Sequence, residues 1–593
     1  MTTEEKNSTS LSRREFLGTT MALGAGGLTG ITSLASAATE VASERAATSK
    51  PLNILFVLTD QERYFDPTTL PAGYSLPGRE RLQNEGISFT NHQIATSVCS
   101  SSRSVIYTGQ HIQHTGVFDN LGFPWSNELS LDTPTIGKYL QEVGYHPAYL
   151  GKCHMIDALE EIEIGDAPDV NLDELNKVMQ QYGFNDYVGV GDIIGMTKGG
   201  YKSDEFTTST AIRWLSTEPP RLENKPWFLA VNLVNPHDVM FYNTDVPGKP
   251  PVQADGPAMA LNQAPAHDLY QRSWDMRLPK SRSEAWDKPG RPRAHYNFQV
   301  ARGALVGQVP NEDARWQRLQ DYYLNCIADC DRHIDRILRE LDELGLADNT
   351  IVVMTSDHGE LAGAHQMNGK GSTAYREQNH VPLWVRHPGH PESAGSECQA
   401  LTSHLDLVPT FLGMAGVDAK RRASLAPNLH GFDLSGLMAS PGEATVDAVR
   451  GGALYNFNMW LFQDPDFLHQ MIAAMKSGED PGKLGLQVDL TRRGAIRSIT
   501  DGRYRFSRYY APLQHNLPNS METLFSLNDV ELYDLDSDPN EMQNLAVDQR
   551  SNGELLLAMN QKLTDIIGAE VGSDNGEFLP ENKRGWALTH FDP

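Results

Sequence analysis

The chain has 593 residues, of which 39% are hydrophobic and 21% are charged, a composition typical of soluble globular proteins long enough for two domains. Its formal net charge of −26 argues against a nucleic-acid partner and against a basic membrane-binding surface. The five cysteines are an odd and sparse set, which does not fit a disulfide framework.

The first segment of the chain predicts an export signal. Residues 12–17 read Ser-Arg-Arg-Glu-Phe-Leu, a twin-arginine pattern, and the next charged residue is Glu40. The Ala-Ser-Ala at 35–37 is typical of a signal-peptidase site. We therefore expect a twin-arginine signal peptide over 1–38, a polar linker over 39–50, transient contact with the twin-arginine translocase, and a periplasmic or secreted protein. The alternatives are a disordered tail with a chance pair of arginines, or an uncleaved anchor.

Four nearly continuous apolar runs predict strands that are buried on both faces of a sheet. They cover residues 52–59, 146–150, 227–234 and 350–355, and helical stretches separate them. Alternating strands and helices imply an α/β fold, with a large, mainly parallel sheet flanked by helices on both faces. Polar residues follow the carboxyl end of each run, which is where α/β proteins place ligands.

A short helix is predicted within residues 97–109. The cap-type residues from Ser100 to Ser102 run into a short apolar-periodic segment. Cys99 then lies at the helix N-terminus, where unpaired backbone N–H groups favour an anion. Arg103 follows one turn later on the same face. The alternative interpretation is a buried structural cysteine beside a surface arginine.

The middle of the chain is less regular. Residues 245–313 have the composition of a long loop, which we interpret as a wall or lid over the site or as a surface insertion. Residues 316–346 have helical spacing. Cys326 and Cys330 lie four apart in that helix, so they could form a metal pair or a disulfide, but two buried core positions are favoured.

The last part of the chain changes character. Short alternating runs at 497–499, 504–506 and 531–535 predict a smaller antiparallel sheet. We therefore expect a catalytic domain over 51–430 and a smaller C-terminal α+β domain over 431–593.

Side chains suited to chemistry gather at the predicted strand ends. Because the ends of parallel strands meet at one edge of a sheet, the fold can bring them together. Carboxylates with an imidazole suit a divalent metal, lysines and an arginine suit an anionic substrate, and histidines transfer protons near neutral pH. Each residue alone also has an ordinary structural role, such as a cap or a solvated charge. The set comprises Asp60, Cys99, Arg103, Lys152, His154, His237, Asp357, His358 and Lys370.

Over about residues 51–547 the sequence resembles the type I sulfatases of the alkaline phosphatase superfamily. The resemblance begins with the opening strand at 53–60. The stretch Cys99-Ser-Ser-Ser-Arg103 is similar to the family's Cys-x-Pro-x-Arg signature, and 151–154 is similar to its Gly-Lys-x-His. Later motifs follow in the family's order, namely Pro236-His237, 356–360, Lys370-Gly371, 405–410, 532–535, Asp538-Pro539 and Asn544-Leu545.

The resemblance implies that Cys99 is oxidised to formylglycine, with a formylglycine-generating enzyme as a transient partner. One hydroxyl of the hydrated aldehyde, polarised by the metal, attacks sulfur and displaces the alcohol. Deprotonation of the second hydroxyl then breaks the carbon–oxygen bond to sulfate and restores the aldehyde. The resemblance also implies the roles of the site residues. The metal ligands are Asp60, Gln61, Cys99, Asp357 and His358. Arg103 holds the nucleophile, and Lys152 and Lys370 bind the sulfate oxygens, while His154 is the base and His237 with Lys370 protonates the leaving oxygen.

Three positions depart from the family's pattern. Ser101 stands where the family usually has Pro or Ala, and a Cys99 left unmodified there is expected to be a metal-adjacent thiolate with a lowered pKa. Gln61 replaces a second Asp, and its amide oxygen is a candidate ligand. His358 replaces an Asn. The metal is therefore calcium or manganese, and the imidazole favours manganese. This combination resembles phosphonate monoester hydrolases and choline sulfatases of the same superfamily.

The predicted reaction is the release of inorganic sulfate from an organic sulfate ester. A phosphonate or phosphate mono- or diester hydrolase on the same scaffold is one alternative, and a non-catalytic sulfate-binding homologue is another. The substrate is expected to be a small-molecule or saccharide sulfate ester, selected by residues 240–315 and 455–490. The sequence leaves the oligomeric state open.

Overall fold

A sheet of eight strands dominates the computed structural model, which describes residues 51–121, 126–160, 171–189, 197–458, 462–479 and 483–574. The predicted signal peptide (1–38) and linker (39–50) lie outside the described residues. Across the sheet the strands are β5 (Asp186–Val188), β4 (His146–Gly151), β6 (Trp227–Pro236), β1 (Asn53–Asp60), β7 (Thr350–Ser356), β8 (Leu383–Arg386), β2 (Ile87–Phe89) and β9 (Ser396–Cys398).

The strands of this sheet run mainly parallel. β1 pairs in parallel with both β6 and β7, and β4 pairs in parallel with β5 and β6. Only β8 runs in the opposite direction, because it pairs antiparallel with β7 and with β2. The four predicted apolar runs are β1, β4, β6 and β7, which confirms the predicted fold class.

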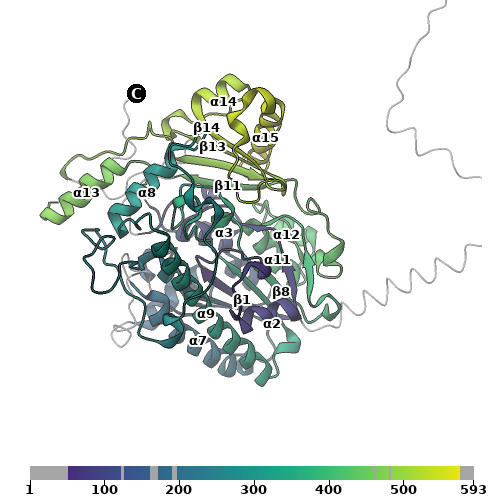
Figure 1. Cartoon of the computed structure of the whole chain (residues 1–593). Helices are drawn as coiled ribbons and strands as arrows, with labels where there is room; N and C mark the ends of the chain where they lie inside the picture. Colours follow the sequence, from purple (N-terminus) through teal and green to yellow (C-terminus); the bar gives the residue numbers. More distant parts are fainter. Residues whose placement is uncertain are drawn as a thin grey trace, which may run out of the picture. The chain divides into compact units, whose positions relative to one another are not determined.

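The apolar side chains of β1 feed two separate cores. Ile54, Phe56 and Leu58 pack on one side of the sheet, while Leu55 and Val57 pack on the other. All eight residues of β1 are buried because helices cover both faces. One face carries α3 (Cys99–Thr108), α5 (Ile136–Glu142) and α11 (Leu407–Met414), and the other carries α7 (Gly199–Thr217) and α9 (Asp313–Glu343), which lie side by side in Figure 1.

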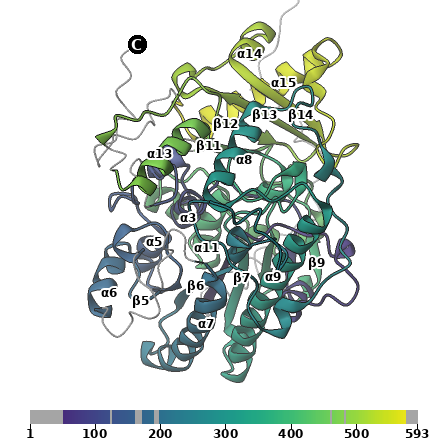
Figure 2. The ribbon, with the colours of Figure 1, turned by 60° about the vertical axis from the view of Figure 1, so that its left-hand side comes forward.

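A second sheet is built from the C-terminal part of the chain. Its four antiparallel strands are β11 (Ala453–Asn458), β12 (Ala495–Thr500), β13 (Tyr504–Tyr510) and β14 (Asn528–Asp534), of which the sequence predicted the last three. One face packs under α15 (Gln549–Glu570) and α14 (Met521–Leu527) (Figure 2). The other face packs on residues that include Val98, directly before α3.

The described residues from Leu52 onward form one compact unit that contains both sheets. The predicted boundary between 430 and 431 falls between the last strand of the large sheet and the first of the small one. The remaining helices and strands are α2 (Pro77–Glu85), β3 (His92–Gln93), α4 (Ile112–Thr115), α6 (Leu172–Gln181), α10 (Arg376–Asn379), β10 (Thr402–Ser403), α12 (Ala419–Leu425) and α13 (Pro465–Ser477).

The prediction of a long loop over 245–313 is wrong in part, because these residues include the helix α8 (Arg293–Val306). Apolar side chains of α8 face more than one neighbour, Phe298 toward the second sheet and Leu305 toward α13, so no single stripe marks the helix in the sequence. The helix predicted at 316–346 is α9. Cys326 and Cys330 are free and buried in its core positions, as favoured.

Among the described residues, no helix is both long enough and apolar enough to cross a membrane.

Candidate active site

The carboxyl ends of neighbouring strands bring the predicted site residues to one edge of the large sheet. Asp60 is the last residue of β1, and Asp357 follows β7 directly. Lys152 comes after β4, and His237 comes after β6. These four side chains are almost entirely removed from solvent. The sheet therefore gathers opposite charges in a buried site, as predicted from the polar residues that follow each strand.

α3 presents Cys99 as its first residue. The helix is capped by Val98 rather than by a serine side chain, so the predicted capping role of the serines is wrong. Ser102 instead donates through Oγ to the backbone carbonyl of Asp357, at 2.5 Å. Because Ser102 lies within the first turn, this bond fastens the start of α3 to the loop after β7.

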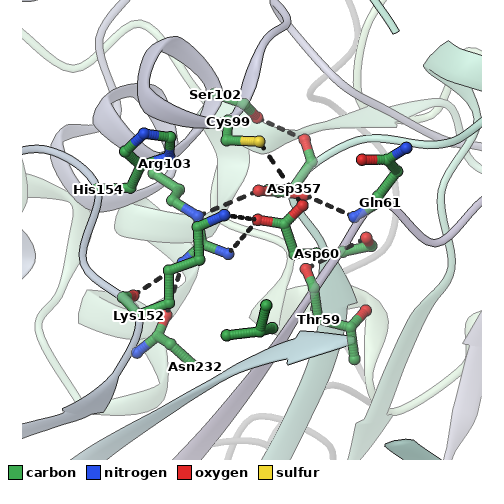
Figure 3. Close-up of polar contacts among 12 residues, drawn as sticks. Thr59, Asp60, Gln61, Cys99, Ser102, Arg103, Lys152, His154, Asn232 and Asp357 are labelled. Atoms are coloured by element: carbon green, nitrogen blue, oxygen red, sulfur yellow. Dashed lines mark hydrogen bonds and ion pairs between the residues drawn. The ribbon is translucent and has the colours of Figure 1, made fainter. Parts of the chain in front are cut away.

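The side chains of Asp60, Asp357 and His358 converge around the sulfur of Cys99. Its Sγ atom lies 3.1 Å from Nε2 of His358. The same atom lies 3.6 Å from Oδ1 of Asp60 (Figure 3). One ligand atom each from Asp60, Cys99, Asp357 and His358 lies within 4.8 Å of the other three. All four residues are fully buried. We call these four residues the metal-type cluster.

Arg103 ties the two carboxylates of the cluster together. Its Nη2 lies 3.1 Å from Oδ2 of Asp60, and its Nε lies 3.1 Å from Oδ2 of Asp357. Nη1 donates to the backbone carbonyl of Lys152 at 3.0 Å. Lys152 adds a second cation, because its Nζ lies 2.7 Å from Oδ2 of Asp60. The position of Arg103 one turn after Cys99 lets a single helix carry both the nucleophilic residue and this clamp.

The two carboxylates ionise differently because they are buried close together. Burial raises the pKa of Asp60, but the charges of Lys152 and Arg103 outweigh it and hold that pKa well below its usual range. Burial, together with the negative charge of Asp60, raises the pKa of Asp357 to about 7. The arginine and lysine of the site therefore do not fully compensate the charge of Asp357. Such a carboxylate is expected where a bound metal cation supplies the remaining positive charge.

His358 is oriented for ligation. Its Nδ1 lies 3.0 Å from the carbonyl oxygen of Gly359, which can only accept, so Nδ1 carries the proton. Nε2, which faces Cys99 and Asp60, is left with its lone pair. Burial, followed by the charge of Lys370, holds the pKa of His358 well below its usual range, so the ring is neutral. A neutral imidazole with its second nitrogen tied to a carbonyl is the usual form of a metal-ligating histidine.

The protein surroundings of Cys99 favour the neutral thiol. Burial, with the nearby charge of Asp60, raises the pKa of Cys99 to about 12. Lys370 and Lys152 lower the pKa of this thiol, but by less than burial and the carboxylate of Asp60 raise it. The predicted thiolate with a lowered pKa requires an adjacent metal ion, and it stays a prediction.

Gln61 lies beside the metal-type cluster but also binds elsewhere. Its backbone N–H donates to Oδ1 of Asp357 at 3.0 Å. Its side-chain oxygen accepts from Nζ of Lys370, and its Nε2 donates to Oε2 of Glu360. The carboxamide that was a candidate ligand is thus hydrogen-bonded to Lys370, and it brings that lysine to the edge of the site.

The two predicted proton-transfer residues lie at the same sheet edge. His237 directly follows Pro236, which pairs with Asp60 across strands β6 and β1. His154 follows Lys152 with a positive φ of 56°, and its backbone N–H donates to Oε1 of Glu160 at 2.7 Å. Both side chains are about 5% exposed or less, so each could exchange a proton only with a group inside the site.

Two residues of the site were not predicted. Asn232 in β6 accepts from the hydroxyl of Tyr107 at 2.6 Å and lies 3.5 Å from Nη1 of Arg103. Glu360 accepts from Gln61 and from the backbone N–H of Gly369. The only signal for Asn232 was a single amide inside an otherwise apolar run, and Glu360 had no signal beyond its place in a motif.

The donor set of the metal-type cluster fits a divalent cation. Two carboxylates and one neutral imidazole offer oxygen and nitrogen ligands from three directions, and the position-99 side chain completes the set. The imidazole is a ligand that manganese accepts more readily than calcium does. Asp60, Asp357 and His358 would hold such an ion.

Comparison with known proteins gives the class of the chain. Residues 52–417 match the family model described as Sulfatase. An N-acetylglucosamine-6-O-sulfatase of Bacteroides thetaiotaomicron is 27% identical over 454 residues, which is 70% of this chain and 75% of that protein. A solved structure of a 2-O GAG sulfatase has a TM-score of 0.60, at 19% identity over 88% of this chain and 93% of that one. The phosphonate monoester hydrolase of Silicibacter pomeroyi has a TM-score of 0.59, at 19% identity over 90% and 100%.

The fold and the site therefore define an enzyme of the alkaline phosphatase superfamily. More closely, the chain belongs to the sulfatase family and is a type I sulfatase, a hydrolase of sulfate esters.

Proposed function

We propose that the protein releases inorganic sulfate from a saccharide sulfate ester, using formylglycine at position 99 and one divalent cation, manganese in preference to calcium. The observation that carries this proposal is the metal-type cluster, in which the residue-99 side chain touches both His358 and Asp60. The saccharide class is supported by the name of the N-acetylglucosamine-6-O-sulfatase relative.

The residue at position 99 has to become a better nucleophile than a buried thiol. With its pKa raised to about 12, Cys99 is neutral at physiological pH. The hydrated aldehyde of formylglycine supplies one hydroxyl as the nucleophile and a second hydroxyl whose deprotonation breaks the carbon–oxygen bond to sulfate. A divalent cation, when bound, supplies positive charge that polarises the ester and favours the ionised nucleophile.

The chain's own residues perform the remaining tasks. Arg103 fixes Asp60 and Asp357, and so fixes the position at which residue 99 meets the ester. Lys152 and Lys370 bind the nonbridging sulfate oxygens and stabilise the charge that accumulates on them. His237 holds the proton that the leaving alcohol oxygen takes. His154 accepts a proton from residue 99 when sulfate is released.

The experiment compares an aryl sulfate, a phenyl phosphonate and a phosphodiester on protein made together with a formylglycine-generating enzyme. We expect the highest kcat/KM with the sulfate and its loss in Cys99→Ala. Cys398→Ala, which removes another buried cysteine far along the chain, is the matched control. Equal sulfate hydrolysis by the Cys99→Ala and Cys398→Ala variants would overturn the proposal.

A phosphonate or phosphate ester hydrolase is the second candidate. It is favoured by the sequence pairs Asp60-Gln61 and Asp357-His358, of which Asp60, Asp357 and His358 lie in the metal-type cluster, and by the likeness in fold to a phosphonate monoester hydrolase. A higher kcat/KM with phenyl phosphonate than with aryl sulfate in the same experiment would select it.

We also propose that the protein is exported through the twin-arginine route to the periplasm or the medium. The support is the Ser-Arg-Arg-Glu-Phe-Leu sequence at 12–17. Changing Arg13 and Arg14 together to lysine should leave the protein in the cytoplasm, as measured by cell fractionation. Unchanged export of that double variant would refute this route.

A further inference from the structure

A second group of buried charges lies in the C-terminal sheet, on the face that is turned away from Cys99. Arg497 on β12 and Arg508 on β13 stand directly opposite each other across the two strands. Side chains alternate along a strand, so Arg508 shares its face with Phe506, which packs under α15. Tyr509, between these positions, points instead toward the core that contains Val98.

The two arginines are not equally compensated. Arg497 binds Asp574 through Nε at 2.6 Å and Nη2 at 3.0 Å. Arg508 is only 1% exposed, yet its Nε and Nη1 have no hydrogen-bond partner in the described part of the chain. Burial lowers the pKa of Arg508 to about 10, so its guanidinium is still charged at neutral pH. Asp574 is the carboxylate that the described part of the chain places on Arg497, and Arg508 makes no ion pair with it, in a place where water is largely excluded.

Two more polar groups stand in the neighbouring row of the same face. Asn458 and Tyr510 are aligned across the sheet through Ala495. Nη1 of Arg497 donates to Oδ1 of Asn458 at 3.0 Å, so Nδ2 of that amide is a donor. This Nδ2 and the Tyr510 hydroxyl are also buried without a partner among the described residues. Rows two residues apart lie roughly 7 Å from one another, within reach of one small ligand.

We propose that Arg508, Asn458 and Tyr510, with Arg497 beside them, form a binding site for a small oxyanion, the C-terminal anion site. An unpaired buried guanidinium is strongly unfavourable, and an acceptor-only anion supplies both the missing charge and the missing acceptors. The site stands on the opposite face of the sheet from the metal-type cluster. It therefore does not depend on the hydrolysis proposed above, and inorganic sulfate is the probe for it.

The direct test is a crystal structure of the full wild-type chain grown with selenate in place of sulfate. We expect an anomalous selenium peak in hydrogen-bond contact with the guanidinium of Arg508. If the guanidinium is surrounded only by water or by protein atoms at saturating selenate, the proposal is overturned. This test needs no variant, so a folding defect cannot obscure it.

A solution test uses the rise in unfolding temperature that added sulfate produces. All proteins carry Lys370→Met, which weakens the sulfate contribution of the active site. Arg508→Met should need about ten times more sulfate for the same rise as its parent. Arg503→Met is the matched control, because Arg503 is 56% exposed and pairs with Asp534 at the surface. Identical sulfate responses of the two arginine variants would contradict the proposal.

Discussion

Nε2 of His358 lies 3.1 Å from Sγ of Cys99, while Nδ1 of the same ring is held by the carbonyl of Gly359. This arrangement aims a neutral lone pair at the place where the two carboxylates of the metal-type cluster also point. The ring cannot turn without losing its hydrogen bond to Gly359, so the bond at Nδ1 fixes the direction in which Nε2 points.

His358→Ala should therefore lose the metal. Removing one of three protein ligands should weaken metal affinity by at least about a hundred-fold. Metal content after dialysis, measured by elemental analysis, reports this independently of turnover. His390→Ala, at a partly exposed histidine paired with Glu392, should keep the wild-type content. Equal metal content in the two variants would show that His358 is not a ligand.

Arg103→Met should destabilise the fold even before catalysis is considered. It leaves Asp60 and Asp357 buried with one cation fewer, which typically costs about 3–5 kcal/mol of unfolding free energy. Urea unfolding of the metal-free protein measures the change. Arg221→Met, at a surface arginine that is 71% exposed, should change stability by less than about 1 kcal/mol. A loss of unfolding free energy of similar size in Arg103→Met and Arg221→Met would show that Arg103 does not stabilise the buried pair of carboxylates.

Gly151→Ala should displace the residue that follows it, Lys152. Gly151 has a φ of 91°, and an added Cβ would lie 2.1 Å from the carbonyl oxygen of Asn232. Gly144→Ala is the matched control, because its φ is 92° and its Cβ would meet no atom within 4 Å. The backbone strain is common to both, so the excess loss of stability in Gly151→Ala, about 1–3 kcal/mol, measures the clash. We expect kcat to fall only in Gly151→Ala. Equal losses of stability and of kcat in Gly151→Ala and Gly144→Ala would exclude the clash with Asn232.

Glu531 should make stability depend on pH. Burial raises the pKa of this carboxyl to about 7, although Tyr375, Tyr509 and Tyr533 donate hydrogen bonds to it. A raised carboxyl pKa means that the folded state holds the proton more tightly than the unfolded state does. Its stabilisation is therefore full below about pH 4.5 and is lost as pH rises to about 7, a change of about 3 kcal/mol.

The variant Glu531→Gln keeps the shape and removes the titration. Relative to wild type, its unfolding free energy should rise from pH 4.5 to 7 and level off above that. The control is Glu522→Gln, at an exposed residue of α14, which should run parallel to wild type. A constant difference between Glu531→Gln and wild type across this range would rule out the raised pKa.

The strand ends could be predicted from the sequence because apolar runs of five to eight residues between helical stretches indicate strands that are buried on both faces of a sheet. A site residue follows each run within three positions, so local patterns alone predicted which edge of the sheet carries the site. α8 could not be found in this way, since its apolar side chains serve two different cores. β11 was missed because its Asn456 and Asn458 interrupt the pattern of a strand.

The electrostatics of the site depend on distances that no local pattern encodes. The lowered pKa expected for an unmodified Cys99 depended on an adjacent metal ion. Complete burial and the closeness of Asp60, 39 positions earlier in the chain, were not visible in the sequence, and both raise the pKa of the thiol. Gln61 is similar, because its bonds to Glu360 and Lys370 join residues about 300 positions apart.

The most direct test of the account is the chemical state of residue 99 in active protein. Mass spectrometry of the peptide that spans Ser97 to Arg103, taken from the natively produced enzyme, distinguishes cysteine from the aldehyde. We predict the aldehyde, in a fraction that rises in proportion to sulfatase activity across preparations. Full activity from protein in which every such peptide carries an unmodified cysteine would contradict the account.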